Sequence, residues 1–161
     1  MSDLKYDTKL SFLYHKKREK FFAFFDSLTK IISLLAVSSL VLAGGLENVT
    51  KAAIAGISVL LTILSICYDF SGNASLHKFL AARFAALRTK LNQDFPQDAL
   101  QAEFFSIQED EPPVLTGLVQ LCQDEIEYAN GCAVAPERLT VRRRLITQFG
   151  GGSYPEMDQH A

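Results

Sequence analysis

Two apolar stretches lie close together near the N-terminus and decide the fold class. Residues 31–46 read IISLLAVSSLVLAGGL and residues 52–68 read AAIAGISVLLTILSICY, with only ENVTK between them. Neither stretch contains a charged residue. As α-helices they would be about 24 and 26 Å long, whereas a hydrocarbon core of about 30 Å needs about 20 residues. Lys30 and Lys51 can each extend a stretch to that length, because a lysine side chain reaches back to the membrane surface.

A buried helical hairpin in a soluble domain is the alternative interpretation of these stretches. The chain has 161 residues, and its remainder is too short and too polar to enclose two helices that are apolar all round. We therefore expect an all-α membrane protein built on a two-helix transmembrane hairpin. Its transmembrane helices should cover about 27–46 and 50–69, with cytoplasmic helices before and after them.

The distribution of charge predicts the orientation of the hairpin. Residues 1–30 carry seven Lys or Arg against four acids, and residues 69–91 carry four against one. The loop between the stretches has one Glu and one Lys. Basic residues thus flank the open side of the hairpin, so the positive-inside rule places both termini in the cytoplasm.

A secretory signal peptide cleaved near Ala43 is a competing interpretation of the first stretch. Eleven charged residues among the first 30 make a poor n-region, and a second apolar stretch follows at once. We therefore expect a membrane-inserted hairpin and not a cleaved leader.

Downstream of the hairpin the sequence predicts an amphipathic helix over about 73–92. Its apolar residues recur at helical spacing, and they are Leu76, Phe79, Leu80, Phe84, Leu87 and Leu91. His77 falls on another face in this interpretation. The helix would pack on other parts of the protein.

The next segment is acidic, with nine acids and no base over residues 92–135. A short helix is expected around 97–106, and Pro112-Pro113 introduce a helix over about 114–130 that Gly131 ends. In that helix Leu115, Leu118, Cys122 and Ala129 share a face, with Glu125 among them. We group residues 1–135 as one domain and expect a helix near 136–149 and a disordered tail over the rest of 136–161.

No catalytic constellation is recognisable. The sequence contains no glycine-rich phosphate loop, nucleophile elbow or histidine pair at metal-ligand spacing. We expect no catalytic, cofactor-binding or metal-binding residues, and no enzyme activity. Adjacent acids such as Asp124-Glu125 are usually solvated. The basic run over 15–20 leads into five residues rich in Phe, which suits a lipid headgroup zone, so we expect no direct nucleic-acid binding.

A stripe of small and polar side chains runs along each apolar helix. In the second it is Ala55, Ser58, Thr62, Ser65 and Asp69, and in the first it is Asp26, Thr29, Ser33 and Ala36. Helix packing explains any single one of these residues, because small residues let helices approach and hydroxyls bond across them. A water-facing surface in an oligomer is the functional alternative. One hairpin has little interface over which to use the whole stripe, so the pattern favours association of several copies. Leu61 should then meet lipid on a neighbouring face.

The order of these predicted helices resembles that of the SLATT-domain family, the SMODS and SLOG-associating two-transmembrane effector domains. The resemblance covers about 6–131 and rests on helix order and hydropathy, on the run HKFLAARFAAL from His77, and on LVQLCQDE from Leu118. It implies a homo-oligomeric effector of a prokaryotic anti-phage defence system. Such an effector forms a pore or disrupts the inner membrane when a cytoplasmic signal or partner activates it. Implied partners are membrane lipid and a sensor, nucleotide-signal synthetase or reverse transcriptase encoded nearby.

Two other functional classes stay open. A phage holin also has a small hairpin and charged ends, although about 90 residues follow the hairpin here. A non-lethal membrane anchor or assembly subunit could dock a partner on its acidic segment. We expect His77 and Glu125 to make polar contacts between the amphipathic helix and the helix over about 114–130. The alternative for each is a solvated side chain with no partner.

Overall fold

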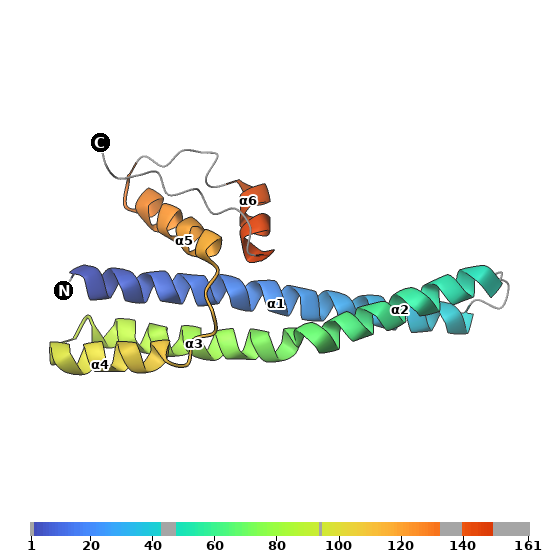
Figure 1. Ribbon diagram of the computed structural model, residues 1–161, viewed down its shortest axis with the longest axis horizontal. Helices are drawn as coiled ribbons and strands as arrows, with labels where there is room; N and C mark the ends of the chain where they lie inside the picture. The colour runs from blue at the N-terminus through green and yellow to red at the C-terminus, as the bar shows by residue number, and fades with distance from the viewer. Residues whose placement is uncertain (1, 43–47, 94, 133–139, 150–161) are drawn as a thin grey trace. The chain divides into compact units, whose positions relative to one another are not determined.

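The computed structural model describes residues 2–42, 48–93, 95–132 and 140–149. Within these ranges every regular element is a helix (Figure 1). In chain order these are α1 (Ser2–Leu42), α2 (Asn48–Tyr68), α3 (Phe70–Lys90), α4 (Gln97–Gln108), α5 (Thr116–Ala129), α6 (Val141–Ile146) and the 3-10 helix η2 (Thr147–Phe149). The expected all-helical fold class is therefore confirmed for the described residues.

Helix α1 is longer than the sequence patterns predict. The expected basic N-terminal helix and the first apolar stretch form one helix of 41 residues. The physical reason is that neither Gly nor Pro occurs between Ser2 and Leu42, so no residue breaks the helix between them. The last residues of the first apolar stretch, 43–46, and the predicted C-terminal tail lie outside the described residues.

The junction between α2 and α3 is a single residue, Asp69. Its backbone has φ 39°, a left-handed conformation that Asp adopts more readily than most residues. Its side-chain Oδ1 accepts a hydrogen bond from the Gly72 backbone N–H at 3.0 Å, and Asn73 Nδ2 donates to the Tyr68 carbonyl at 2.8 Å. Local side-chain bonding therefore ends one helix and starts the next.

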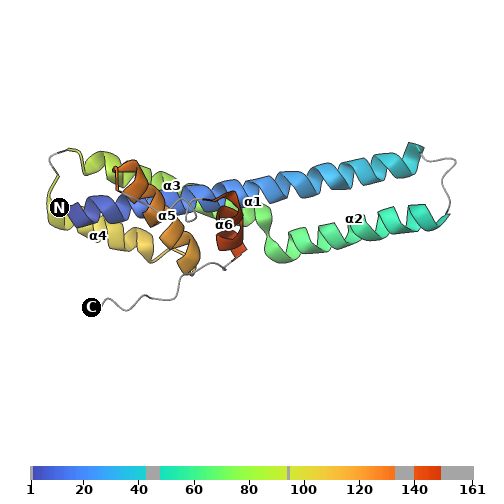
Figure 2. The same ribbon diagram turned by 90° about the horizontal axis from the view of Figure 1, so that it is seen from above.

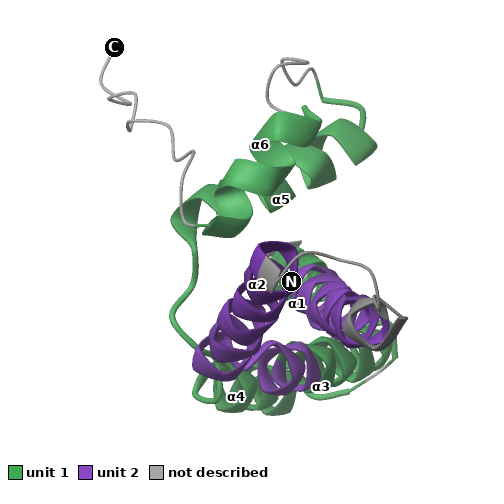
Figure 3. Cartoon of the chain, turned by 90° about the vertical axis from the view of Figure 1, so that its right-hand side faces the viewer, with its two compact units in different colours: residues 1–18, 77–161 green, residues 19–76 purple. Residues whose placement is uncertain are grey.

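The chain divides into two compact units, coloured separately in Figure 3. Unit 1 contains residues 1–18 and 77–161, and unit 2 contains residues 19–76. Helices α1 and α3 each contribute residues to both units.

Unit 1 has two clusters of buried apolar residues. In the first, α3 and α4 pack against each other and against Leu4 and Phe12 of α1; its buried residues are Leu80, Phe84, Leu87, Leu91, Leu100, Phe104 and Ile107. In the second, α5 packs on α1 through Tyr14, Leu118, Leu121 and Cys122. The first half of α1 takes part in both clusters, through Leu4 and Phe12 in the first and Tyr14 in the second.

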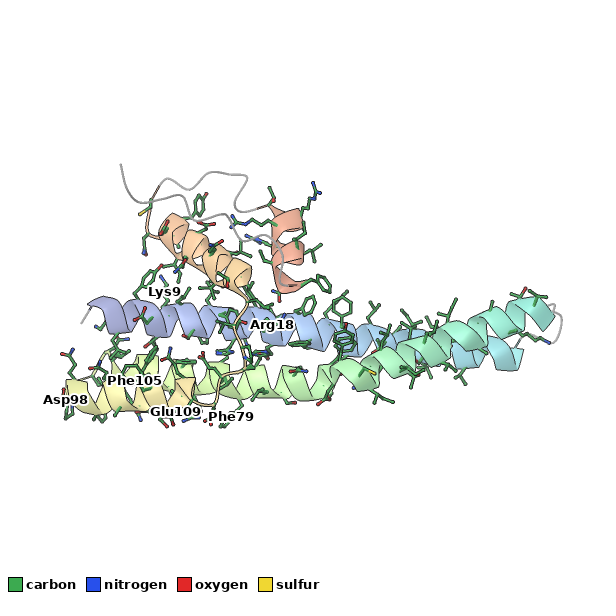
Figure 4. All side chains as sticks on the ribbon, in the orientation of Figure 1. Lys9, Arg18, Phe79, Asp98, Phe105 and Glu109 are labelled. Atoms are coloured by element: carbon green, nitrogen blue, oxygen red, sulfur yellow. The ribbon has the colours of Figure 1, made fainter. Side chains whose placement is uncertain are left out.

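The predicted apolar face of α3 is partly wrong. Phe79 is 57% exposed and Leu76 is 37% exposed, and Phe79 lies on the outer side of the helix (Figure 4). His77 is only 2% exposed. His77, Leu80, Phe84, Leu87 and Leu91 follow one another at intervals of three and four residues, so the histidine belongs to the buried face.

In unit 2 the later part of α1 and the whole of α2 run side by side (Figure 2). Both helices are long and apolar enough to cross a membrane. In the most apolar 18 residues of α1, 17% of the residues are buried. In the most apolar 18 residues of the second candidate helix, Val49–Lys90, none is buried. Leu34, Leu60 and Ile66 are 68%, 62% and 73% exposed. Helices from the core of a soluble protein would bury such side chains, whereas lipid would cover them in a membrane.

An aromatic cluster joins these helices at the start of α3. Phe70 lies 5.7 Å from both Phe25 and Tyr68, measured between ring centroids, and 6.4 Å from Phe22. Phe22 and Phe25 belong to the aromatic run that follows the basic residues of α1. Aromatic side chains of this kind concentrate at membrane–water interfaces.

Candidate functional site

The polar stripes of the two apolar helices meet in unit 2 along one groove. This groove has a volume of about 440 Å³. Thr29 and Ser33 line it from α1, and Thr62 and Ser65 line it from α2. The remaining lining residues are Lys30, Leu34, Val37 and Leu61. Four of the predicted stripe residues are thus brought together on a surface that the two helices leave open.

The hydroxyl groups of the stripe bond within their own helices. Thr62 Oγ1 donates to the Ser58 carbonyl at 2.8 Å, and Thr29 Oγ1 donates to the Phe25 carbonyl at 3.0 Å. Ser58 Oγ donates to the Ile54 carbonyl at 2.9 Å, and Ser58 does not line the groove. Bonds of this kind satisfy a hydroxyl in an apolar medium and leave its oxygen lone pair for a further partner.

The two acidic residues at the ends of the stripes have local partners. Asp26 Oδ2 accepts a hydrogen bond from Lys30 Nζ at 2.7 Å, one turn further along α1. Asp69 caps α3, as described above, and its side chain remains exposed. Neither residue lines the groove itself.

Leu61 does not lie where the sequence predicts. It lines the same groove as Thr62, although the sequence places it on a neighbouring, lipid-facing side. The reason is that the groove is wide enough to include residues about 100° apart on α2. Leu60 is 62% exposed and lies almost opposite Thr62, so it is the residue on α2 that faces away.

A second candidate site is a buried polar cluster in unit 1. His15 Nδ1 of α1 lies 2.8 Å from His77 Nδ1 of α3, and His15 Nε2 lies 3.0 Å from Glu111 Oε1. His15 is fully buried and His77 is 2% exposed, whereas Glu111 lies in the segment between α4 and α5. His15 therefore connects three parts of unit 1 through its two ring nitrogens.

Aromatic rings enclose this cluster. Phe84 stacks on the His15 ring at 5.6 Å between centroids, with the planes at 9°. Tyr14 meets the same ring edge-on at 5.2 Å, and its hydroxyl accepts a hydrogen bond from the Leu115 backbone N–H at 3.1 Å. Burial, the neighbouring His15 and the Arg18 cation lower the pKa of His77 from 6.5 to about 4. At neutral pH the His77 imidazole is therefore uncharged.

An ionic cluster lies where α5 meets α1 and α6. Arg143 Nη1 lies 3.0 Å from Asp124 Oδ2, with only 9% and 8% of the two side chains exposed. Glu125 Oε1 accepts a hydrogen bond from Lys17 Nζ at 2.8 Å, and it forms an ion pair with Arg144 Nη2 at 3.3 Å. The sequence-based expectation that Asp124 and Glu125 are solvated is therefore wrong, because basic residues distant in sequence surround both.

The polar contacts that His77 and Glu125 make in the described part of the chain reach α1, through His15 and Lys17 respectively. Sequence patterns did not single out His15, Glu111 or Arg143. The burial of His77 could have been predicted from its spacing to Leu80 and Phe84. Its hydrogen-bond partners could not, because they depend on how α1 packs against α3. Among the described residues, no group of three His, Cys, Asp or Glu side chains is arranged to hold a metal ion.

The chain matches no family model, no curated protein and no solved structure. Its function is therefore argued from the two sites alone.

Proposed function

We propose that this protein is a membrane effector that oligomerises through its two apolar helices and permeabilises a prokaryotic inner membrane. The groove lined by Thr29, Ser33, Thr62 and Ser65 is the observation that carries the proposal. Polar positions within a membrane generally face protein or water. Two helices alone leave this groove open, and further copies of the chain would enclose it.

The large exposed apolar surface of unit 2 supports membrane insertion. Leu34, Leu35, Val59, Leu60 and Ile66 are each between 58% and 73% exposed. Contiguous apolar surface of this kind is rare on soluble monomers. Insertion would leave unit 1, with its ion pairs and buried histidines, on the aqueous side, where the positive-inside rule places it in the cytoplasm.

The resemblance to the SLATT-domain effectors adds the biological context to this proposal. It suggests a role in anti-phage defence, in which a cytoplasmic partner or signal activates the assembly. The exposed acidic residues Asp98 on α4, Glu109 at its end and Glu127 on α5 offer a surface for such a partner. The partner would be a sensor, a nucleotide-signal synthetase or a reverse transcriptase encoded nearby.

Overproduction in bacteria tests the proposal, because high concentration drives assembly without the natural signal. The full chain should stay in the membrane fraction after carbonate extraction, form cross-linked oligomers and dissipate the membrane potential. A reporter that works only in the cytoplasm should be active when fused to the C-terminus. Carbonate extraction of the protein, or an unchanged membrane potential despite insertion and oligomerisation, would contradict the proposal.

A further inference from the structure

The groove between α1 and α2 contains a charge as well as hydroxyl groups. Lys30 is the charged residue among the described residues that line it, and 68% of its side chain is exposed. Its Nζ atom lies 2.7 Å from Oδ2 of Asp26, whose side chain is 18% exposed. The carboxylate at the end of the α1 stripe therefore has a cation beside it, and that cation lines the groove.

Asp69, at the end of the α2 stripe, lies at the same end of the groove as Asp26. Each of the two is about one helical turn from a hydroxyl residue that lines the groove, and the two helices run side by side in opposite directions (Figure 2). The rings of the adjacent residues, Phe25 and Phe70, lie 5.7 Å apart between centroids. Asp69 accepts a hydrogen bond from an uncharged donor, the Gly72 backbone N–H, which leaves its negative charge in place.

We infer that Lys30 sets the ion selectivity of the pathway, by cancelling the charge of Asp26 and leaving that of Asp69. The inference rests on the proposed function, since it requires that assembled copies conduct ions along this groove. Two carboxylates and one ammonium group give each chain a net charge of −1 at this end of the groove. A ring of such chains attracts cations only weakly.

The short distance between Lys30 and Asp26 makes the pair act as a unit. Opposite charges 2.7 Å apart form a dipole, whose field declines faster with distance than the field of a single charge. At an ionic strength of 0.1 M a single charge acts over about 10 Å. Removal of either partner therefore converts a local dipole into a full charge, which is negative without Lys30 and positive without Asp26.

Reversal potentials measured across planar lipid bilayers test the inference. The full chain is purified, reconstituted and placed in a KCl gradient, which gives the permeability ratio of K⁺ to Cl⁻. Lys30→Met should raise this ratio about fivefold, the effect of one unit charge on an ion at contact distance in water, and Asp26→Asn should lower it by about the same factor. The double variant Asp26→Asn/Lys30→Met removes the whole pair, and its ratio should equal that of the wild type.

Lys5→Met is the control for the removal of a cation as such. Lys5 is exposed and lies on α1 25 residues before Lys30, which is about 38 Å along a helix. That distance exceeds the range of about 10 Å over which a charge acts at 0.1 M salt. The permeability ratio of the Lys5→Met protein should therefore equal that of the wild type.

Two results would overturn the inference while the proposed function stands. One is a conducting Lys30→Met protein with the wild-type ratio, and the other is a double variant whose ratio departs from the wild type as far as that of Lys30→Met. If Lys30→Met does not insert, Asp26→Asn decides alone, because its ratio must fall. A wild-type chain that inserts but carries no current would instead contradict the proposed function, and the inference with it.

Discussion

Arg143 on α6 and Asp124 on α5 form an ion pair at 3.0 Å that is almost fully buried. The Thr147 hydroxyl, also buried, donates to the Arg143 carbonyl at 3.0 Å, so the same residue organises the helix end. Burying two charges costs free energy that good geometry offsets, but removing one partner leaves the other charge buried and uncompensated. The pair therefore acts as the attachment of α6 to α5.

Asp124→Asn should release α6 from α5. The loss of a buried partner typically costs about 3 kcal/mol or more, which corresponds to a decrease of about 100-fold or more in the protection of the α6 amides against hydrogen exchange. Exchange measured by mass spectrometry over residues 140–149 checks this expectation. Arg142→Met changes an exposed neighbour on the same helix and should change protection by less than about twofold. Equal effects of the two variants would show that the buried pair has no special role.

Cys122 should be almost inert towards thiol reagents in the folded protein. It is fully buried beside Tyr14, and burial raises the pKa of its thiol from 9.0 to about 12. At pH 8 its maleimide labelling should be at least about 100-fold slower than that of Cys132, which is exposed. Tyr14→Ala should accelerate labelling of Cys122 alone. Mass spectrometry of the labelled peptides measures both rates, and equal rates in the wild type would contradict the packing of α5 on α1.

The raised pKa of the Cys122 thiol predicts that the folded protein loses stability at high pH. The unfolded chain ionises Cys122 near pH 9.0, whereas the folded chain keeps the thiol neutral to about pH 12. Stability from this residue is therefore complete below pH 9 and decreases between the two values. Cys122→Ala should remove this part of the pH dependence in urea unfolding, although it also lowers stability at every pH through lost packing. An unchanged slope would show that Cys122 does not cause it.

Glu125 should couple strongly to Lys17 and weakly to Arg144. Both cations contact its Oε1 atom, but the Lys17 side chain is 20% exposed and the Arg144 side chain 50%. A double-mutant cycle with Lys17→Met and Glu125→Gln should give a coupling energy of about 1 kcal/mol, and the cycle with Arg144→Met about 0.5 kcal/mol or less. Both energies come from urea unfolding at low salt. A larger coupling to Arg144 would contradict this geometry.

Much of the fold could be predicted because periodicity and hydropathy are local properties of the sequence. The uncharged run over 52–68 marks most of α2. The proline pair and Gly131 bracket α5. The buried polar pairs could not be predicted in this way. Asp124 and Arg143 are 19 residues apart, and His15 and His77 are 62 residues apart, so each contact depends on how helices pack. The sequence alone indicates a buried polar pair in one way, through a polar residue at a core-facing position such as His77.

Part of the candidate membrane site could also be predicted. The spacing along each apolar helix identified Thr29, Ser33, Thr62 and Ser65, which line one groove. The spacing could not show that Ser58 lies outside the groove or that Leu61 lines it. The width of the groove depends on the distance between α1 and α2, which single-helix patterns do not contain.

Thr62→Leu tests whether the groove conducts ions, as a hypothesis that follows from the proposed function. Thr62 is the hydroxyl at the middle of the α2 stripe, and its replacement by Leu makes the groove apolar there and prone to exclude water. Insertion and oligomer size should be unchanged, since Leu is a good helix former in an apolar segment. Depolarisation of induced cells should be lost, and a voltage-sensitive dye measures it.

Leu60→Ala is the matched control for this experiment. A substitution at Leu61 would not serve, because Leu61 lines the groove. Leu60 is 62% exposed on the side of α2 away from the groove, where its truncation removes only contacts with lipid. The Leu60→Ala protein should depolarise cells as the wild type does. With Asp26 and Asp69 near the ends of the stripes, the wild-type leak should also favour cations weakly. If Thr62→Leu depolarises cells as fully as Leu60→Ala, the stripe serves helix packing, and the groove is not a conduction path.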